Sequence, residues 1–244
     1  MGYLGFEVRR LLRIRALLMT GTLLPLGIYL AFTLLGRDDM SEPYRGVPLS
    51  AVVMVSVAGV GAMIGVLTHS AGVAHERADH WLWHLRVTPM PPSRVVFVRA
   101  VVSLLTVPPP VVAIAVAATV LHGLRLPPGR WLLLVAVMWL GAVPFALLGL
   151  AFGFMLTREL VGPVTTGAWL VLAFTGGLFM PVESFPAWLR LAAELMPTFR
   201  YSELGWAAVG GGPPVAAGLA VLGAWTVLFG GLAAWAYRRA TAVR

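Results

Sequence analysis

Long apolar runs separated by short polar stretches make up most of the chain. A membrane-spanning helix needs about 20 mostly apolar residues to cross a hydrocarbon core of roughly 30 Å. Six runs reach that length, and they occupy residues 16–36, 47–69, 95–121, 131–156, 161–181 and 214–237. We therefore predict an all-α integral membrane protein with six transmembrane helices, built as a single transmembrane domain over residues 1–244.

The segment before the first run predicts a short interfacial helix over residues 3–15. Apolar residues such as Leu4 and Leu11 fall on one side of this helix, and Arg9 and Arg10 fall largely on another. Such arginines can meet anionic headgroups at the cytoplasmic surface, although a basic flank that only fixes topology is an equally good interpretation. The first run exceeds the roughly 7–15 apolar residues of a signal peptide and lacks a small-x-small cleavage site, so we expect it to stay in the mature protein.

Composition and charge support a membrane location. The chain is 59% hydrophobic and 11% charged, with a mean hydropathy of +0.87, which excludes an ordinary soluble domain. Its net charge of +8 comes from arginines at the ends of apolar runs, which indicates orientation in a bilayer rather than a nucleic-acid partner. With the N-terminus inside, twelve arginines fall in cytoplasmic segments and six in outer loops. We predict a multi-pass plasma-membrane protein with both termini in the cytoplasm.

The sequence contains no lysine and no cysteine. A Walker A loop, GxxxxGK[ST], needs its lysine on the nucleotide phosphates. The chain therefore lacks a standard P-loop ATPase site, and any ATP-driven work requires another subunit. The lack of cysteine excludes disulfides, thiol nucleophiles and thiolate metal sites.

Two patterns inside the runs concern helix packing. The segments GAMIG at 61–65 and GLAFG at 149–153 match GxxxG, whose small residues let helix backbones approach closely. Packing within the chain explains this motif more often than dimerisation does.

Three consecutive prolines, Pro108, Pro109 and Pro110, interrupt the third run. Each removes a backbone donor and disfavours helix at the preceding residue, so we predict a break there. Broken backbone at membrane depth is tolerated only against protein or a wet cavity. The break should therefore face the bundle or a transport path, and an interruption that serves packing alone is an equal alternative.

The longest inner connection covers residues 70–94. Its centre, residues 76–87, lacks glycine and proline and predicts a short helix that Pro89 follows. Trp81 and Leu85 give this helix apolar surface among charged neighbours. Such a helix serves either as an interfacial anchor or as a docking surface for a cytoplasmic partner.

Two histidines in this predicted helix raise the question of a metal site. His80 and His84 stand four residues apart, a spacing at which two imidazoles can share one ion. Glu76 and His84, however, are about 12 Å apart along a helix that rises about 1.5 Å per residue. Trp81 also stands where an HExxH motif has its glutamate. We predict no metal site, no catalytic residue and no cofactor bound by this chain.

The connection between the last two runs, residues 176–201, is aromatic and rich in proline. Pro186 can begin a short helix and Pro197 can follow its end. Trp188 and Leu191 lie near one face of that helix, and Arg190 lies on the other. We predict an outer re-entrant helical segment between spans five and six, with Trp188 at headgroup level.

The same connection carries the pattern of a known family. It contains Gly177, Phe179 and Pro181, then FPAWL at 185–189 and MPTF at 196–199, followed by Tyr201 and Glu203. This pattern resembles the signature between the last two spans of ABC-2 type permeases, the membrane subunits of ATP-binding-cassette exporters. The inner stretch from Glu76 and Arg77 through Leu85 to Thr88 and Pro89 is similar to the family's loop after the second span, whose helix couples to the ATPase. His80 and Trp81 depart from the small Gly-Thr pair often found there.

The resemblance implies a half-transporter that pairs with a second permease copy or a related chain and with two cytoplasmic ABC ATPase subunits. ATP and Mg would bind to those subunits, and the permease itself would not be an enzyme. The residues implied to form the ATPase-coupling surface are Glu76, Arg77, His80, Trp81, Leu85, Thr88 and Pro89. Those implied to shape an outer gate are Pro181, Pro186, Trp188, Pro197 and Tyr201. A solvated inner loop and a plug that never touches cargo are the alternatives for these two sets.

The nearest likeness is to exporters of drugs and antibiotics, which implies drug efflux, antibiotic resistance and a hydrophobic cargo such as a drug, an antibiotic or a lipid-like molecule. Two other functions stay open at this point. One is a histidine-dependent intramembrane enzyme, which bound transition metal or activity without ATP would favour. The other is the membrane component of a sensing complex, in which ATP-driven movement signals instead of exporting.

Overall fold

The computed structural model describes residues 15–35, 43–44, 46–78, 92–179, 182–210 and 215–242. Most of these residues are helical, and β1 (Pro43–Tyr44) pairs with β2 (Val47–Pro48) in a small antiparallel hairpin. The helices are α2 (Arg15–Leu35), α3 (Leu49–Ala71), α4 (Val73–Ala78), α6 (Pro92–Leu104), α7 (Pro108–His122), α8 (Pro128–Gly141), α9 (Val143–Met155), α10 (Arg158–Thr175), the 3-10 turn η1 (Val182–Ser184), α11 (Ala187–Glu194), α12 (Pro197–Val209) and α13 (Val215–Ala242). The predicted all-α class is confirmed, and the predicted interfacial helix at 3–15 lies outside the described residues.

Four stretches of the described chain are long and apolar enough to cross a membrane. They are Leu49–Ala78, Val96–His122, Pro128–Met155 and Ala216–Ala240, close to four of the runs in the sequence. The first predicted span coincides with α2, where the apolar stretch Gly21–Leu35 is shorter. The fifth coincides with α10, which begins with the charged residues Arg158 and Glu159. Six spans therefore stay a prediction, and an α-helical membrane protein is the established class.

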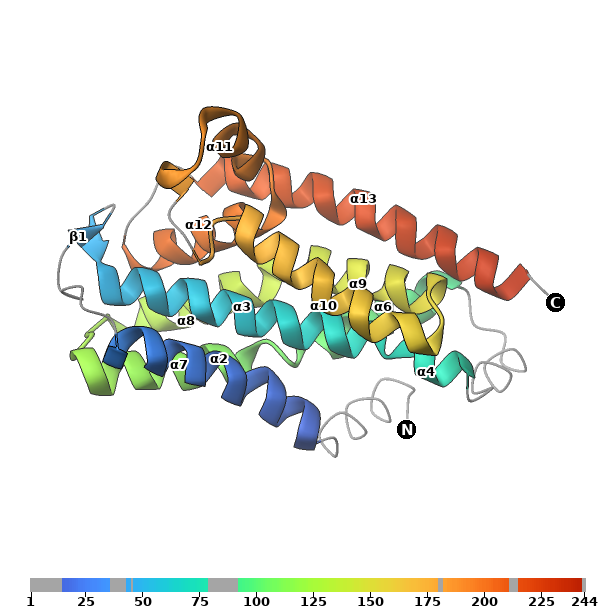
Figure 1. Cartoon of the computed structure of the whole chain (residues 1–244), viewed down its shortest axis with the longest axis horizontal. Helices are drawn as coiled ribbons and strands as arrows, with labels where there is room; N and C mark the ends of the chain where they lie inside the picture. The colour runs from blue at the N-terminus through green and yellow to red at the C-terminus, as the bar shows by residue number, and fades with distance from the viewer. Residues whose placement is uncertain are drawn as a thin grey trace.

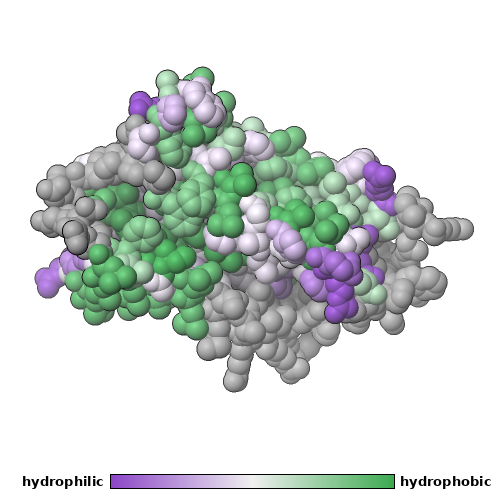
Figure 2. Space-filling model, viewed as in Figure 1, coloured by the Kyte–Doolittle hydropathy of each residue, from purple (hydrophilic) through white to green (hydrophobic). Residues whose placement is uncertain are grey.

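The long helices run roughly along the long axis of the molecule (Figure 1). Helix α4 and the end of α13 lie towards one end, and β1 with the turn between α7 and α8 lies towards the other. On the visible face, apolar atoms cover the middle and polar atoms gather near the ends (Figure 2). This distribution suits a bundle whose sides meet lipid and whose ends meet water.

Helix α3 is the buried centre of the bundle. It packs against α2, α7, α9, α10 and α12, and its small residues allow close approach. A Cβ at Gly61 would meet Pro25 and Pro110, and a Cβ at Gly65 would meet Thr106. The first GxxxG motif therefore brings α2 and the broken third span against α3, which confirms packing within the chain.

The proline break in the third span lies where the sequence predicts it. Helix α6 ends at Leu104, α7 begins at Pro108, and Val107 between them is fully buried. The indole Nε1 of Trp139 donates a hydrogen bond to the Leu104 carbonyl at 2.9 Å. This bond gives a partner to one carbonyl group at the interrupted end of α6. The break therefore faces the protein interior, as predicted.

The fourth span departs from the sequence prediction because it is also broken. Helix α8 ends at Gly141 and α9 begins at Val143, with Ala142 between them. Pro144 supplies the reason, since a proline has no backbone N–H to continue the helix and favours the first positions of a new one.

Candidate functional site

Two regions of the bundle contain the residues singled out in the sequence. At the end that contains α4, which the sequence predicts to be the inner one, Glu76 and Arg77 lie in α4. The other predicted coupling residues, His80, Trp81, Leu85, Thr88 and Pro89, lie outside the described residues. At the other end, Pro186, Trp188, Pro197 and Tyr201 belong to α11 and α12 or begin them, and Pro181 lies outside the described residues.

Glu76 joins α4 to α6 through an ion pair with Arg99. The Arg99 Nη1 and Nη2 atoms donate to the two Glu76 carboxylate oxygens at 2.9 and 2.6 Å. The side chains are only 14% exposed for Glu76 and 8% for Arg99, so the pair is largely removed from water. Bidentate pairs of this kind fix geometry as well as adding energy. The ion pair therefore holds the start of the inner loop against the inner end of the third span.

Arg77 joins the same short helix to α9. Its Nη1 atom donates to the carbonyl of Gly153 at 3.1 Å and to the carbonyl of Phe154. These carbonyls belong to the last turn of α9, where helix geometry leaves acceptors without intrahelical donors and where a cation is favoured. We call Glu76, Arg77, Arg99 and these two carbonyls the inner cluster.

Close backbone packing reinforces the inner cluster. A Cβ at Gly149 would lie 2.7 Å from the Leu67 carbonyl oxygen, and a Cβ at Gly153 would lie 3.0 Å from that of Ala71. The second GxxxG motif thus brings α9 directly onto the inner half of α3. As a result, α3, α4, α6 and α9 meet beside the point where the chain enters residues 79–91.

Helix α11 lies at the outside of the bundle, and its boundaries follow the prolines as predicted. Pro186 precedes its first residue, and Pro197 begins the next helix, α12. Trp188 is 72% exposed, and Leu191 and Leu195 are exposed as well, whereas Ala193 is fully buried. In Figure 1, α11 projects from one side of the bundle. The helix therefore presents an apolar, aromatic face outward, as an interfacial helix does.

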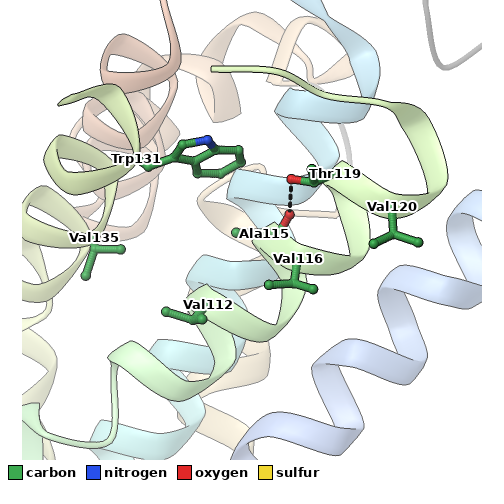
Figure 3. Close-up of a pocket in the computed structure, with 7 residues that line it drawn as sticks. All are labelled: Val112, Ala115, Val116, Thr119, Val120, Trp131 and Val135. Carbon is green, nitrogen blue, oxygen red and sulfur yellow. Dashed lines mark hydrogen bonds between the residues drawn. The ribbon is translucent and has the colours of Figure 1, made fainter. Parts of the chain in front are cut away.

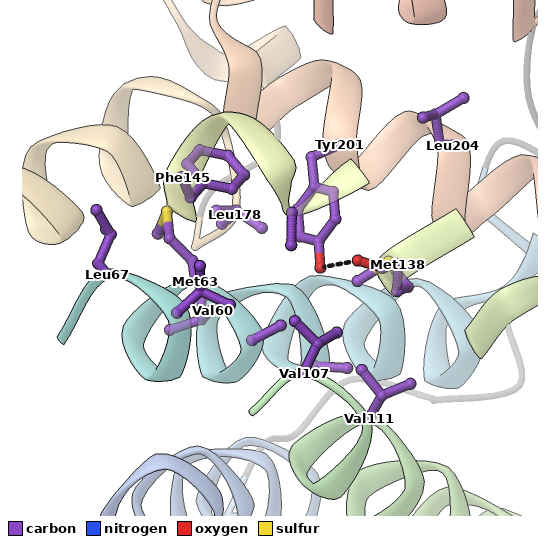
Figure 4. Packing of buried hydrophobic residues seen from close by; sticks show 14 of the residues in the cluster. Val60, Met63, Leu67, Val107, Val111, Met138, Phe145, Leu178, Tyr201 and Leu204 are labelled. Atoms are coloured by element: carbon purple, nitrogen blue, oxygen red, sulfur yellow. Dashed lines mark hydrogen bonds between the residues drawn. The ribbon is translucent and has the colours of Figure 1, made fainter. Parts of the chain in front are cut away.

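Helix α12 is far more buried than its sequence suggests. The Tyr201 hydroxyl donates to the Met138 carbonyl at 2.9 Å (Figure 4), and the Thr198 hydroxyl donates to the Leu172 carbonyl at 2.8 Å. Arg130 reaches the other end of α12, where its Nη1 atom donates to the Val209 carbonyl at 3.1 Å. Hydrogen bonds from three positions therefore fix α12 against α8 and α10.

A second buried ion pair lies within α12. Arg200 Nη1 donates to a Glu203 carboxylate oxygen at 2.8 Å, and both side chains are mostly buried. A spacing of three residues places the two side chains on the same face of a helix. The pairing lets a helix with two charged residues pack among apolar neighbours such as Phe145.

Sequence reasoning missed Arg99 and Arg200 as site residues. The arginine count treats Arg99 only as an orienting charge, although its place within the apolar segment VVFVRAVVSLL is a usable signal. An ionisable residue inside such a run usually pairs with another charged or polar group or belongs to a functional site. Glu203 is identified in the sequence only as part of the family pattern.

The hydroxyl of Thr198 offers a test of how α12 is held. Changing Thr198→Val keeps the side-chain shape but leaves the Leu172 carbonyl without this donor, so we expect the free energy of unfolding to fall by about 1–2 kcal/mol. Thermal unfolding in detergent measures it. Thr166→Val on the exposed side of α10 serves as the control, and equal unfolding midpoints for the two variants would contradict the role of this hydrogen bond.

The histidine alternative concerns the four histidines between residues 69 and 84, of which His69 and His75 are described. Among the described residues, no group of three His, Cys, Asp or Glu side chains could hold one metal ion. His75 is exposed in α4, and His80 and His84 lie outside the described residues.

The family of the protein follows from a comparison with known families. The model described as "ABC-2 family transporter protein" matches residues 39–235, which is most of the chain. The chain belongs to the ABC-2 transporter family. The matched region of this ABC-2 protein includes both the inner cluster and the α11–α12 segment. The resemblance seen in the sequence is therefore confirmed.

A curated relative of this ABC-2 protein has nearly the same length. The chain is similar to the protein named "Putative transport permease YvfS" of Bacillus subtilis (strain 168), with 24% identity over 243 residues. The match covers 97% of this chain and 96% of the relative. The likeness therefore extends across the whole permease and is not confined to the signature between the last two spans.

Proposed function

We propose that this ABC-2 transport permease is the transmembrane subunit of an ABC exporter that uses ATP hydrolysed by separate cytoplasmic subunits. The observation that carries the proposal is the inner cluster. It ties the start of the inner loop to α6 through Glu76 and Arg99 and to α9 through Arg77. A force applied by a partner to residues 79–91 is therefore delivered to two membrane helices at once.

The proposed partners follow from this role. Residues 80–89 contact an ABC ATPase subunit, which binds ATP and Mg, and a second permease copy or a related chain completes the pathway. In this assignment Glu76 and Arg77 act as positioning residues within the permease. His80, Trp81, Leu85, Thr88 and Pro89 provide the surface that meets the ATPase.

The proposed cargo is hydrophobic, of the drug, antibiotic or lipid-like class, and drug efflux with antibiotic resistance is the corresponding role. The α11–α12 segment forms the outer gate in this proposal, with Tyr201 anchoring α12 to α8. The arginine distribution supports a plasma-membrane orientation with both termini in the cytoplasm.

A pull-down from the native membrane with a C-terminal tag tests the proposal. We expect a stoichiometric P-loop ATPase in the eluate, together with ATP hydrolysis that depends on it. A chain that purifies alone in gentle detergent, without a nucleotide-hydrolysing partner, would count against the exporter role. Metal analysis of the same eluate tests the histidine enzyme.

A single substitution in the inner loop sharpens this experiment. We expect Leu85→Asp to weaken ATPase co-purification at least about tenfold, because a charge placed in an apolar contact costs more than about 1.4 kcal/mol. Quantitative immunoblotting of the eluate measures it. Leu85→Met keeps the apolar contact and should retain the partner, so undiminished co-purification with Leu85→Asp would refute the assignment.

A further inference from the structure

Helices α7 and α8 enclose an apolar groove beside the turn that joins them (Figure 3). The groove has a volume of about 350 Å³, within the range of roughly 300–1,000 Å³ seen for small-ligand pockets. Its lining residues are Val112, Ala115, Val116, Thr119 and Val120 of α7 with Trp131 and Val135 of α8. None of these residues belongs to the inner cluster or to the α11–α12 segment.

The chemistry of the lining favours a hydrocarbon occupant. Thr119 carries the hydroxyl group of the lining, and this hydroxyl already donates to the Ala115 carbonyl at 2.8 Å within α7. Figure 3 shows that bond and the valine side chains around it. The groove thus offers apolar contact without an unsatisfied hydroxyl that would need a polar ligand.

The position of the groove favours an occupant from the bilayer. Its walls belong to the candidate spans Val96–His122 and Pro128–Met155, and Val116 and Val120 are 57% and 76% exposed. Trp131 lies in the first turn of α8, at the end of the groove that is near the turn. An indole at that place is typical of headgroup level, where its apolar ring and polar N–H are both accommodated.

The charge beside the groove favours an anionic headgroup. Arg125 is exposed in the connection 123–127, which joins the two walls, and Arg130 lies in the first turn of α8. Residues 119–135 contain no aspartate or glutamate. A basic residue near a membrane surface attracts anionic lipid by about 1 kcal/mol.

We propose that this groove binds one acyl chain of an anionic phospholipid, with the phosphate beside Arg125. The lipid belongs to the leaflet that contains the α7–α8 turn, which is the outer leaflet in the orientation proposed above. The site does not depend on the transport role, because it is formed by α7, α8 and their connection alone.

Filling the groove tests the acyl-chain part of the proposal. The full chain, purified with its co-purifying subunits and delipidated, is titrated with phosphatidylglycerol, and native mass spectrometry counts the bound lipid. We expect Val116→Trp to weaken binding of the first lipid about tenfold, as the indole occupies the chain's place. The control Val227→Trp changes a valine of α13 that is 77% exposed and should bind as the unmodified chain does.

The headgroup part has its own test. Arg125→Gln should weaken phosphatidylglycerol binding about fivefold, the equivalent of one basic contact, and leave phosphatidylcholine with the same chains unaffected. Glycerol 3-phosphate, which has the anionic group without the chain, should not bind measurably. Equal affinities for the two phospholipids would overturn the headgroup assignment.

Two further outcomes would overturn the groove assignment. One is equal lipid binding by Val116→Trp and Val227→Trp. The other is a loss of oligomers in Val116→Trp at an unchanged lipid count, which would make the groove a contact between protein chains. Circular dichroism and size-exclusion chromatography verify folding, and Val120→Trp replaces Val116→Trp if the latter does not fold.

Discussion

Changing Glu76→Leu is expected to lower the free energy of unfolding by about 3–5 kcal/mol, because it leaves a buried guanidinium without its carboxylate. Arg99 donates a hydrogen bond to each carboxylate oxygen of Glu76, and its side chain is only 8% exposed. The substitution therefore removes two charge-assisted hydrogen bonds from a cation that is largely out of contact with water. Equilibrium unfolding of the purified chain in detergent measures the effect.

The double variant Glu76→Leu with Arg99→Met shows whether pairing is the cause. Replacing both partners of a buried ion pair with apolar side chains is often neutral, so the double variant should recover most of the lost stability. Glu159→Leu, at an exposed acidic residue in the first turn of α10, removes a helix N-terminal carboxylate in water and should lower the unfolding midpoint much less than Glu76→Leu does. If the double variant instead loses the sum of what Glu76→Leu and Arg99→Met lose separately, the ion pair does not couple α4 to α6.

Changing Gly149→Ala is expected to destabilise the bundle by about 1–3 kcal/mol, although it adds a single methyl group. That methyl group would lie 2.7 Å from the Leu67 carbonyl oxygen and 2.8 Å from the Ser70 Cβ. Both distances are shorter than carbon contacts at their optimum of about 3.5–4.0 Å. Helices α3 and α9 would have to separate, and the α9 carbonyls that Arg77 contacts would move with them.

A glycine in open surroundings provides the control for this prediction. Gly223 lies in α13, and a Cβ there meets nothing within 4 Å. Gly223→Ala should be neutral or stabilise the helix by up to about 1 kcal/mol, because alanine has the higher helix propensity. Unfolding midpoints shifted in the same direction by both substitutions would contradict the close-packing explanation.

Much of the helical architecture could be predicted because the length of an apolar run and the position of a proline can both be read from a short stretch of sequence. The run 47–69 became α3, and Pro108 begins α7 as the loss of a backbone donor requires. Pro186 and Pro197 likewise mark the starts of α11 and α12. Pro144 carried the same signal, and treating 131–156 as one continuous span overlooked it.

The site contacts could not be predicted to the same degree because they depend on how helices rotate against one another. Glu76 and Arg99 are 23 residues apart, and their pairing requires α4 and α6 to present particular faces. The burial of α12 depends on carbonyls from α8 and α10 that receive Tyr201 and Thr198.

The breaks in the third and fourth spans separate a half of the bundle that contains α4 from a half that contains α12. Breaks at 105–107 and at Ala142 fall near the middle of their spans, while α3 and α13 continue unbroken beside them. The hydrogen bond from Trp139 to the Leu104 carbonyl links one break to the other. In the exporter proposed above, the two breaks serve as a pair of coupled joints: the half that contains α4 moves through Glu76 and Arg77 while α12 stays fixed against α8. In that role, one end of the transport pathway opens while the other stays closed.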